Sequence, residues 1–150
     1  MIFIEFDPTL KIDLPRELLE RTAAAALRQQ SAPDADLTLV LTGDTRLRAL
    51  NRDFLHTDAP TDVLSFPSDE HDPETGRRYL GDVIISVLRA ASQAQAGKHP
   101  FEQEVQLLVV HGVLHLLGHD HAEAGGKARM WAAQAAVLES LGLSPAIVHD

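Results

Sequence analysis

Four short apolar runs, each bounded by turn-forming residues, are typical of β-strands. The first alternates apolar with charged residues, and in the second Leu37, Leu39 and Leu41 alternate with Thr38, Val40 and Thr42. Alternation with a period of two places the side chains on the two faces of a sheet in turn. The four runs predict strands over residues 2–6, 37–42, 63–66 and 79–86.

The third predicted strand lies in a proline-bounded segment. Pro60 precedes it and Pro67 follows it. Because proline cannot donate a hydrogen bond within a sheet, we expect this strand at a sheet edge, where its open backbone groups could receive an extended substrate. Residues 68–78 contain almost no apolar side chain, which predicts a mobile loop between the third and fourth strands.

Five longer segments carry apolar residues at helical spacing. In chain order, the first helix is predicted to start at Asp13 with Pro15, the next two at the caps Asp44 and Ser86, the fourth at Pro100, and the last after the Gly125-Gly126 pair. In the second helix we expect Leu47, Leu50 and Phe54 to point inward. Four strands mixed with about five helices, without strict alternation, predict a single α+β domain over residues 1–150, with a mixed four-stranded sheet covered by helices.

Composition narrows the function classes. The chain of 150 residues has no cysteine, which excludes disulfides and thiolate metal sites and suits the cytoplasm. No apolar run approaches the roughly 20 residues of a membrane span, so we expect no membrane association. The formal charge of −9 argues against broad polyanion binding, so a nucleic-acid substrate would need a local basic surface, and we expect no DNA binding.

The segment with the most specific chemistry is HGVLHLLGHDH, residues 111–121. His111 and His115 stand four residues apart on a buried helix, so their imidazoles share one face and can bind one ion together. Gly118 allows the chain to turn back and bring His121 as a third ligand. Three imidazoles that leave one position open are typical of a catalytic zinc site. We therefore expect one divalent ion per chain, zinc, with nickel as the alternative.

The histidine spacing matches the metzincin protease pattern except at one position. Gly112 stands where those proteases carry the glutamate that acts as general base. The helix therefore lacks the side chain that a protease of this class uses as its general base. His119 is a second choice as ligand or a cleft residue, and Asp120 could orient a ligand imidazole. For proton transfer the candidates are His119, Asp62 and Asp82, although both carboxylates could instead cap turns.

Three segments, PTDVLSFP, LGDVIIS and HGVLHLLGHDH, occur in that order and together resemble the YbeY family of bacterial endoribonucleases and rRNA maturation factors. The resemblance implies an α+β metal-dependent hydrolase with His111, His115 and His121 as metal ligands. It also implies single-stranded RNA as substrate, notably the 3′ end of small-subunit rRNA, a role in ribosome quality control, and ribosomal particles or ribosomal proteins as partners.

One position departs from the family pattern. Leu55 stands where the family usually has an arginine regarded as phosphate-facing. Arg52 and His56 lie next to it at helical spacing, and Arg52 is the better substitute because its guanidinium is always charged. Two other functions stay open at this point. One is a metalloprotease with its base elsewhere, and the other is a non-enzymatic ribosome-assembly factor.

Overall fold

A mixed sheet forms the centre of the computed structural model, which describes residues 1–58, 61–119 and 124–145. Over these residues the sheet has four strands in the order β1-β2-β4-β3. The pairs β1/β2 and β2/β4 are parallel, and β3/β4 is antiparallel. The bounds are Ile2–Phe6 for β1, Asp36–Thr42 for β2, Val63–His71 for β3 and Arg78–Ser86 for β4. The predicted edge position of the third strand is confirmed.

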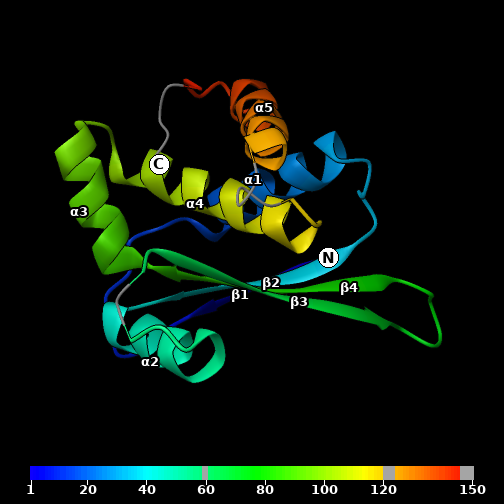
Figure 1. The fold of residues 1–150 in the computed structure, drawn as a ribbon, viewed down its shortest axis with the longest axis horizontal. Helices are drawn as coiled ribbons and strands as arrows, with labels where there is room; N and C mark the ends of the chain where they lie inside the picture. The colour runs from blue at the N-terminus through cyan, green and yellow to red at the C-terminus, as the bar shows by residue number, and fades with distance from the viewer. Residues whose placement is uncertain (59–60, 120–123, 146–150) are drawn as a thin grey trace.

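Helices cover both faces of the sheet (Figure 1). Within the described ranges there are five: α1 (Arg16–Gln29), α2 (Asp44–Leu55), α3 (Val87–Gly97), α4 (Phe101–Leu116) and α5 (Ala124–Ser140). Figure 1 shows α1, α4 and α5 on one side of the sheet and α2 on the other. The predicted single-domain α+β fold is confirmed. Among these helices none is both long enough and apolar enough to cross a membrane.

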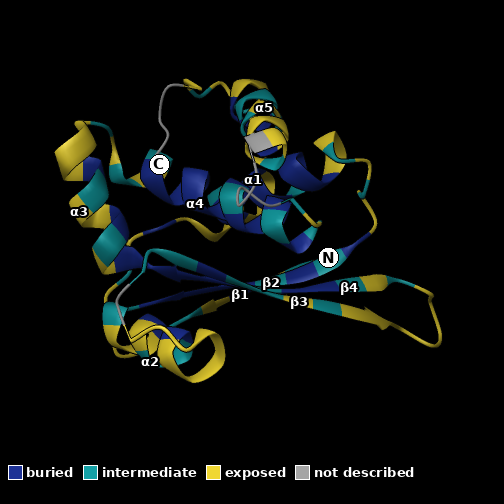
Figure 2. Ribbon diagram, viewed as in Figure 1, coloured by how far each residue is buried: buried dark blue, intermediate teal, exposed yellow. Residues whose placement is uncertain are grey.

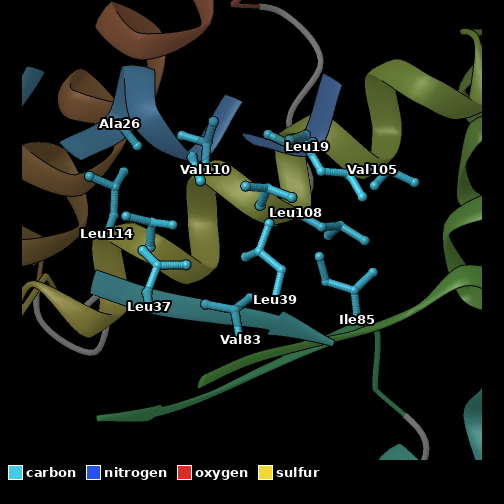
Figure 3. Close-up of a cluster of buried hydrophobic side chains, with 14 of the residues drawn as sticks. Leu19, Ala26, Leu37, Leu39, Val83, Ile85, Val105, Leu108, Val110 and Leu114 are labelled. Carbon is cyan, nitrogen blue, oxygen red and sulfur yellow. The ribbon is translucent and has the colours of Figure 1, made fainter. Parts of the chain in front are cut away.

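The main core lies between the sheet and helix α4 (Figures 2 and 3). Leu39, Val83 and Ile85 of the sheet are fully buried and face α4. From Glu104 to Val110 every residue of α4 is buried, as expected for a helix that is apolar on nearly all sides. The helix that carries His111 and His115 is therefore held rigidly by the core.

Because side chains alternate along a strand, those that do not face α4 lie on the other face of the sheet, toward α2. Val40, Leu64 and Ile84 pack with Leu47 of α2 in a second, smaller cluster. On β4, Ile84 and Asp82, two residues before it, therefore face α2, whereas Leu80, Val83 and Ile85 belong to the main core on the α4 side. This division decides which predicted site residues can approach the histidines.

The expected loop over residues 68–78 is shorter in the structure. Strand β3 continues to His71 and β4 begins at Arg78. The turn is held by Asp72, whose carboxylate accepts hydrogen bonds from the backbone amides of Glu74 and Thr75. Backbone pairing in an exposed hairpin needs no apolar side chains, which is why the polar composition misled the prediction.

The structure corrects the predicted cap of the second helix and the predicted orientation of Phe54, and it confirms the predicted cap at Ser86. Helix α2 has Gly43 at its N-cap, and Asp44 is its first residue, accepting a hydrogen bond from the Ser86 hydroxyl. Ser86 caps α3 as predicted, since its side chain accepts from the Arg89 amide at 3.1 Å. Phe54 does not point into the core. It meets Phe66 edge to face, which leaves 63% of it exposed.

Candidate metal centre

The imidazoles of His111 and His115 converge on one face of α4. Their Nε2 atoms are 3.1 Å apart, and the ring centroids are separated by 4.7 Å with the ring planes at 70°. Both side chains are half-buried. The i, i+4 spacing on a rigid helix produces this approach, because residues four apart lie one above the other.

The distance between the Nε2 atoms of His111 and His115 fits a zinc ion bound between them. Two imidazole nitrogens that each lie about 2.05 Å from zinc at a tetrahedral angle are about 3.3 Å apart. The observed Nε2 separation of 3.1 Å is close to this value. The predicted third ligand, His121, and its neighbour Asp120 lie outside the described residues. Within the described residues no group of three metal-binding side chains occurs, so the three-histidine centre stays a prediction.

A buried glutamine from another helix holds the first histidine. Gln134 of α5 places its Oε1 3.1 Å from Nδ1 of His111. An amide oxygen can only accept a hydrogen bond, so Nδ1 carries the proton and the lone pair stays on Nε2. The sequence-based reasoning missed this residue. The signal was present, because Gln134 is a polar residue on the apolar stripe formed by Met130, Val137 and Leu138.

The chain leaves α4 at Gly118, as predicted. Its φ of 96° lies in the left-handed region, which glycine adopts without strain. Just beyond it, the Nε2 of His119 lies 2.7 Å from Oε1 of Gln30, at the C-terminal end of α1. His119 therefore uses this nitrogen to connect α4 with α1, and could bind a metal through Nε2 only by giving up that contact.

Gly112 lies at the contact between α4 and the sheet. A Cβ atom there would be 2.4 Å from Cγ1 of Val83 and 3.3 Å from Oγ of Ser65. A glutamate side chain has no room at this position. The protease pattern thus fails for a structural reason, because the position of its general base faces the packed sheet.

A family model described as Endoribonuclease YbeY matches residues 7–142 of the chain. The chain belongs to the YbeY family. The Endoribonuclease YbeY of Chloroflexus aurantiacus is 42% identical over 149 residues, covering 95% of this chain and 96% of the relative. That of Heliobacterium modesticaldum is 42% identical over 137 residues, covering 84% and 82%. The solution structure of TM1509 from Thermotoga maritima matches with a TM-score of 0.59 at 25% identity, covering 95% of this chain and 92% of that one.

Membership of the YbeY family confirms the resemblance seen in the three sequence motifs. It gives no support to the protease or to the non-enzymatic assembly factor. Family membership does not assign roles to individual residues. Their positions in the structure show which predicted residues lie near the two histidines and which lie on other parts of the fold.

In this YbeY chain Asp82 lies on the α2 side of the sheet, whereas His111 and His115 lie on the other side. Its carboxylate accepts a hydrogen bond of 2.5 Å from the hydroxyl of Tyr79, which also contacts Thr38. Burial raises the pKa of Tyr79 to about 12, so its hydroxyl stays protonated and remains a donor. Asp82 therefore acts in a structural network on the α2 side.

Asp62 is held at the start of β3. Its carboxylate accepts a hydrogen bond from the amide of Val63 at 2.8 Å and from Nε2 of Gln93 on α3 at 3.3 Å. These contacts match the capping role that the sequence left open for it. The described contacts of Asp62 do not connect it with His111 or His115.

Arg52, Leu55 and His56 belong to the C-terminal end of α2, on the other side of the sheet from α4 (Figure 1). The guanidinium of Arg52 donates to the Asp53 carboxylate at 3.0 Å, and this pairing raises the pKa of Arg52. Leu55 is 53% exposed. The structure does not bring these side chains to the two histidines, and the role of Arg52 as a substitute for the family arginine stays a prediction.

Proposed function

We propose that this protein is a single-strand-specific, metal-dependent endoribonuclease whose metal is held by His111, His115 and His121. The class of activity follows the name shared by its YbeY relatives, Endoribonuclease YbeY. The observation that supports the site is the convergence of two Nε2 atoms at 3.1 Å on a buried helix. We propose zinc as the ion, because imidazole ligands suit it, with nickel as the alternative.

A zinc ion bound there would lower the pKa of its water to about 7 and polarise a phosphoryl oxygen, both of which suit phosphodiester cleavage. The chain's own contribution is to fix the ligands. The buried helix α4 holds both imidazoles, and Gln134 keeps the proton of His111 on Nδ1. This arrangement leaves Nε2 of His111 as a donor atom for the ion.

Within the described residues no strand pairs with the outer side of β3, and this edge offers a place for an extended RNA strand. Ser65 of β3 donates to the Gly112 carbonyl, so this strand is fastened beside the helix that carries the histidines. An unpaired strand edge presents backbone donors and acceptors in a row. We propose that a single strand lies along this edge and that a duplex is too wide to be cleaved there.

The finer biological role is also a proposal. We infer that the substrate is ribosomal RNA, notably the 3′ end of small-subunit rRNA, with a further role in ribosome quality control, and that ribosomal particles or ribosomal proteins are partners. These inferences extend the YbeY resemblance. The cytoplasmic location expected from the lack of cysteine likewise stays a prediction.

The test is cleavage of matched single-stranded and double-stranded RNA by protein loaded with zinc. We expect cleavage of the single strand by the wild type and none by His115→Ala, with His71→Ala as a control because His71 lies in the exposed hairpin. Cleavage that co-elutes with the protein and is equal in wild type and His115→Ala would overturn the proposed site.

A further inference from the structure

Gln134 occupies an unusual place for an amide side chain. It is only 3% exposed, and the neighbouring stripe residues Met130, Val137 and Leu138 are fully buried. Burying an unpaired amide costs free energy, and an apolar residue would fill this stripe of α5 without that cost. A glutamine at this position therefore needs a partner, and its Oε1 contacts Nδ1 of His111 at 3.1 Å.

The contact links two helices that are far apart in the sequence. His111 is on α4 and Gln134 is on α5, and their positions differ by 23 in the sequence. Neutral imidazole carries one proton, which can sit on either ring nitrogen. Because Oε1 of Gln134 accepts a hydrogen bond from Nδ1 of His111, the tautomer with its proton on Nε2 is excluded. The same contact stops the imidazole ring of His111 from rotating. The remaining lone pair then points toward Nε2 of His115, 3.1 Å away.

We propose that Gln134 is a positioning residue that presets the tautomer and ring orientation of His111 for metal binding. The inference rests on the proposed metal centre and adds a residue outside its ligand set. Partners of this kind hold ligand imidazoles in many metal sites, and their loss commonly costs about ten- to a hundredfold in metal affinity.

The chemical group at residue 134 should also affect how tightly the site binds zinc. A carboxylate at residue 134 would accept the same Nδ1 proton, would make His111 a more basic ligand and would add a negative charge beside the cation. Gln134→Glu should therefore bind zinc at least as tightly as the wild type. Gln134→Leu has a similar size but no acceptor, so it should bind about ten- to a hundredfold more weakly.

The chain supplies a matched control in Gln106. This residue is 5% exposed and donates from Nε2 to the hydroxyl of Thr22 at 3.1 Å, which joins α4 to α1. Gln106→Leu removes a buried amide from the same packed region without removing the acceptor on His111. A loss of affinity caused only by damage to the core would appear in both leucine variants.

Two measurements test the proposal. The first is the zinc dissociation constant of each variant by competition with a chelator, with circular dichroism to verify folding. We expect weaker binding for Gln134→Leu, wild-type binding for Gln106→Leu, and equal or tighter binding for Gln134→Glu. Equal weakening in both leucine variants, or binding by folded Gln134→Glu that is tenfold weaker than wild type, would overturn the positioning role.

The second measurement uses metal-free protein and so does not depend on the metal centre. Nitrogen NMR at a pH where imidazoles are neutral reports which ring nitrogen of His111 carries the proton. We expect Nδ1 in the wild type and in Gln134→Glu, and a mixture in Gln134→Leu. An unchanged tautomer in Gln134→Leu would overturn the inference. Failure of the wild type to bind zinc would instead overturn the proposed function, while the tautomer result would still decide the role of Gln134.

Discussion

The hydroxyl of Ser65 donates to the carbonyl of Gly112 at 2.9 Å, joining the edge strand β3 to the helix that carries the histidines. The contact is possible because Gly112 has no side chain, so α4 can approach the sheet closely. The spacing between this helix and the sheet fixes where the two imidazoles stand. Several properties of the protein can be tested from this contact and the geometry around it.

Gly112→Ala should destabilise the fold. The added Cβ would lie 2.4 Å from Cγ1 of Val83, and overpacking of this kind typically costs about 1–3 kcal/mol. Urea unfolding measures the loss. Gly125→Ala is the control, because among the described residues its Cβ would meet the end of the flexible Arg129 side chain at 3.5 Å, an ordinary contact distance. Alanine there should leave stability unchanged or raise it by up to about 1 kcal/mol. Equal stability of the wild type and Gly112→Ala would refute the close-packing argument.

The paired substitution His111→Ala with His115→Ala should abolish divalent metal binding. Removing both imidazoles leaves the ion without the two ligands that the rigid helix provides. Elemental analysis of protein purified without chelator should find about one zinc or nickel ion per wild-type chain, and none in the double variant. His71→Ala should retain the metal. The same metal content in the double variant and the wild type would contradict the assignment.

If the bound RNA reaches the C-terminal end of α2, Leu55→Arg should speed up its cleavage. It restores the cation that the family usually has at this position, and one such preorganised donor is typically worth about a hundred- to a thousandfold in rate. Leu55 is 53% exposed, so the longer side chain should be tolerated. Single-turnover cleavage of a single-stranded RNA measures the change. A rate equal to that of the wild type would show that no cation is needed at residue 55.

Arg52→Ala in the same assay decides whether Arg52 replaces the missing arginine. If it does, its guanidinium must leave Asp53 to reach the RNA, and its removal should lower the rate by up to about a hundredfold. His56→Ala provides the comparison, because His56 sits at the C-cap of α2 in a left-handed conformation. Unchanged rates in both variants would assign Arg52 to the helix surface alone.

Stability should depend on pH through Asp36. Its carboxylate accepts hydrogen bonds of 2.9 and 2.6 Å from Arg77, which hold its pKa below the usual 3.8, and the N-terminal ammonium adds to this effect. The contribution is present above pH 3.8 and is lost as the pH falls through the lower pKa of the folded state. Urea unfolding should show that Arg77→Ala costs at most about 1 kcal/mol at pH 7 and less near pH 3.

The exposed pair of Asp69 and Arg78 is the control for this effect. Its closest atoms are 3.6 Å apart and Asp69 is 86% exposed, so solvent should screen the attraction. Asp69→Asn should leave the free energy of unfolding unchanged at both pH values. An Arg77→Ala effect of the same size at pH 7 and pH 3 would show that packing, rather than charge, holds residues 36 and 77 together.

Several features could be predicted from the sequence because they depend on nearby residues. The spacing of His111 and His115 places them on one helix face whatever the helix packs against. The prolines around residues 63–66 favour an edge strand, and the Ser86 cap depends on an amide only three residues away. The motifs that resemble the YbeY family also predicted an endoribonuclease, and family membership confirms it.

Other features depend on contacts between distant segments. Which sheet face receives Asp82 is decided by how β4 pairs with its neighbours, and α2 takes Arg52 to the side away from α4. The length of the β3-β4 hairpin depends on backbone pairing rather than on side-chain polarity. The contact of Gln134 with His111 requires α5 to dock on α4. Local periodicity thus determined the pair of imidazoles, but only long-range packing decided which side chains surround them, because those contacts join segments that the chain's local conformation does not bring together.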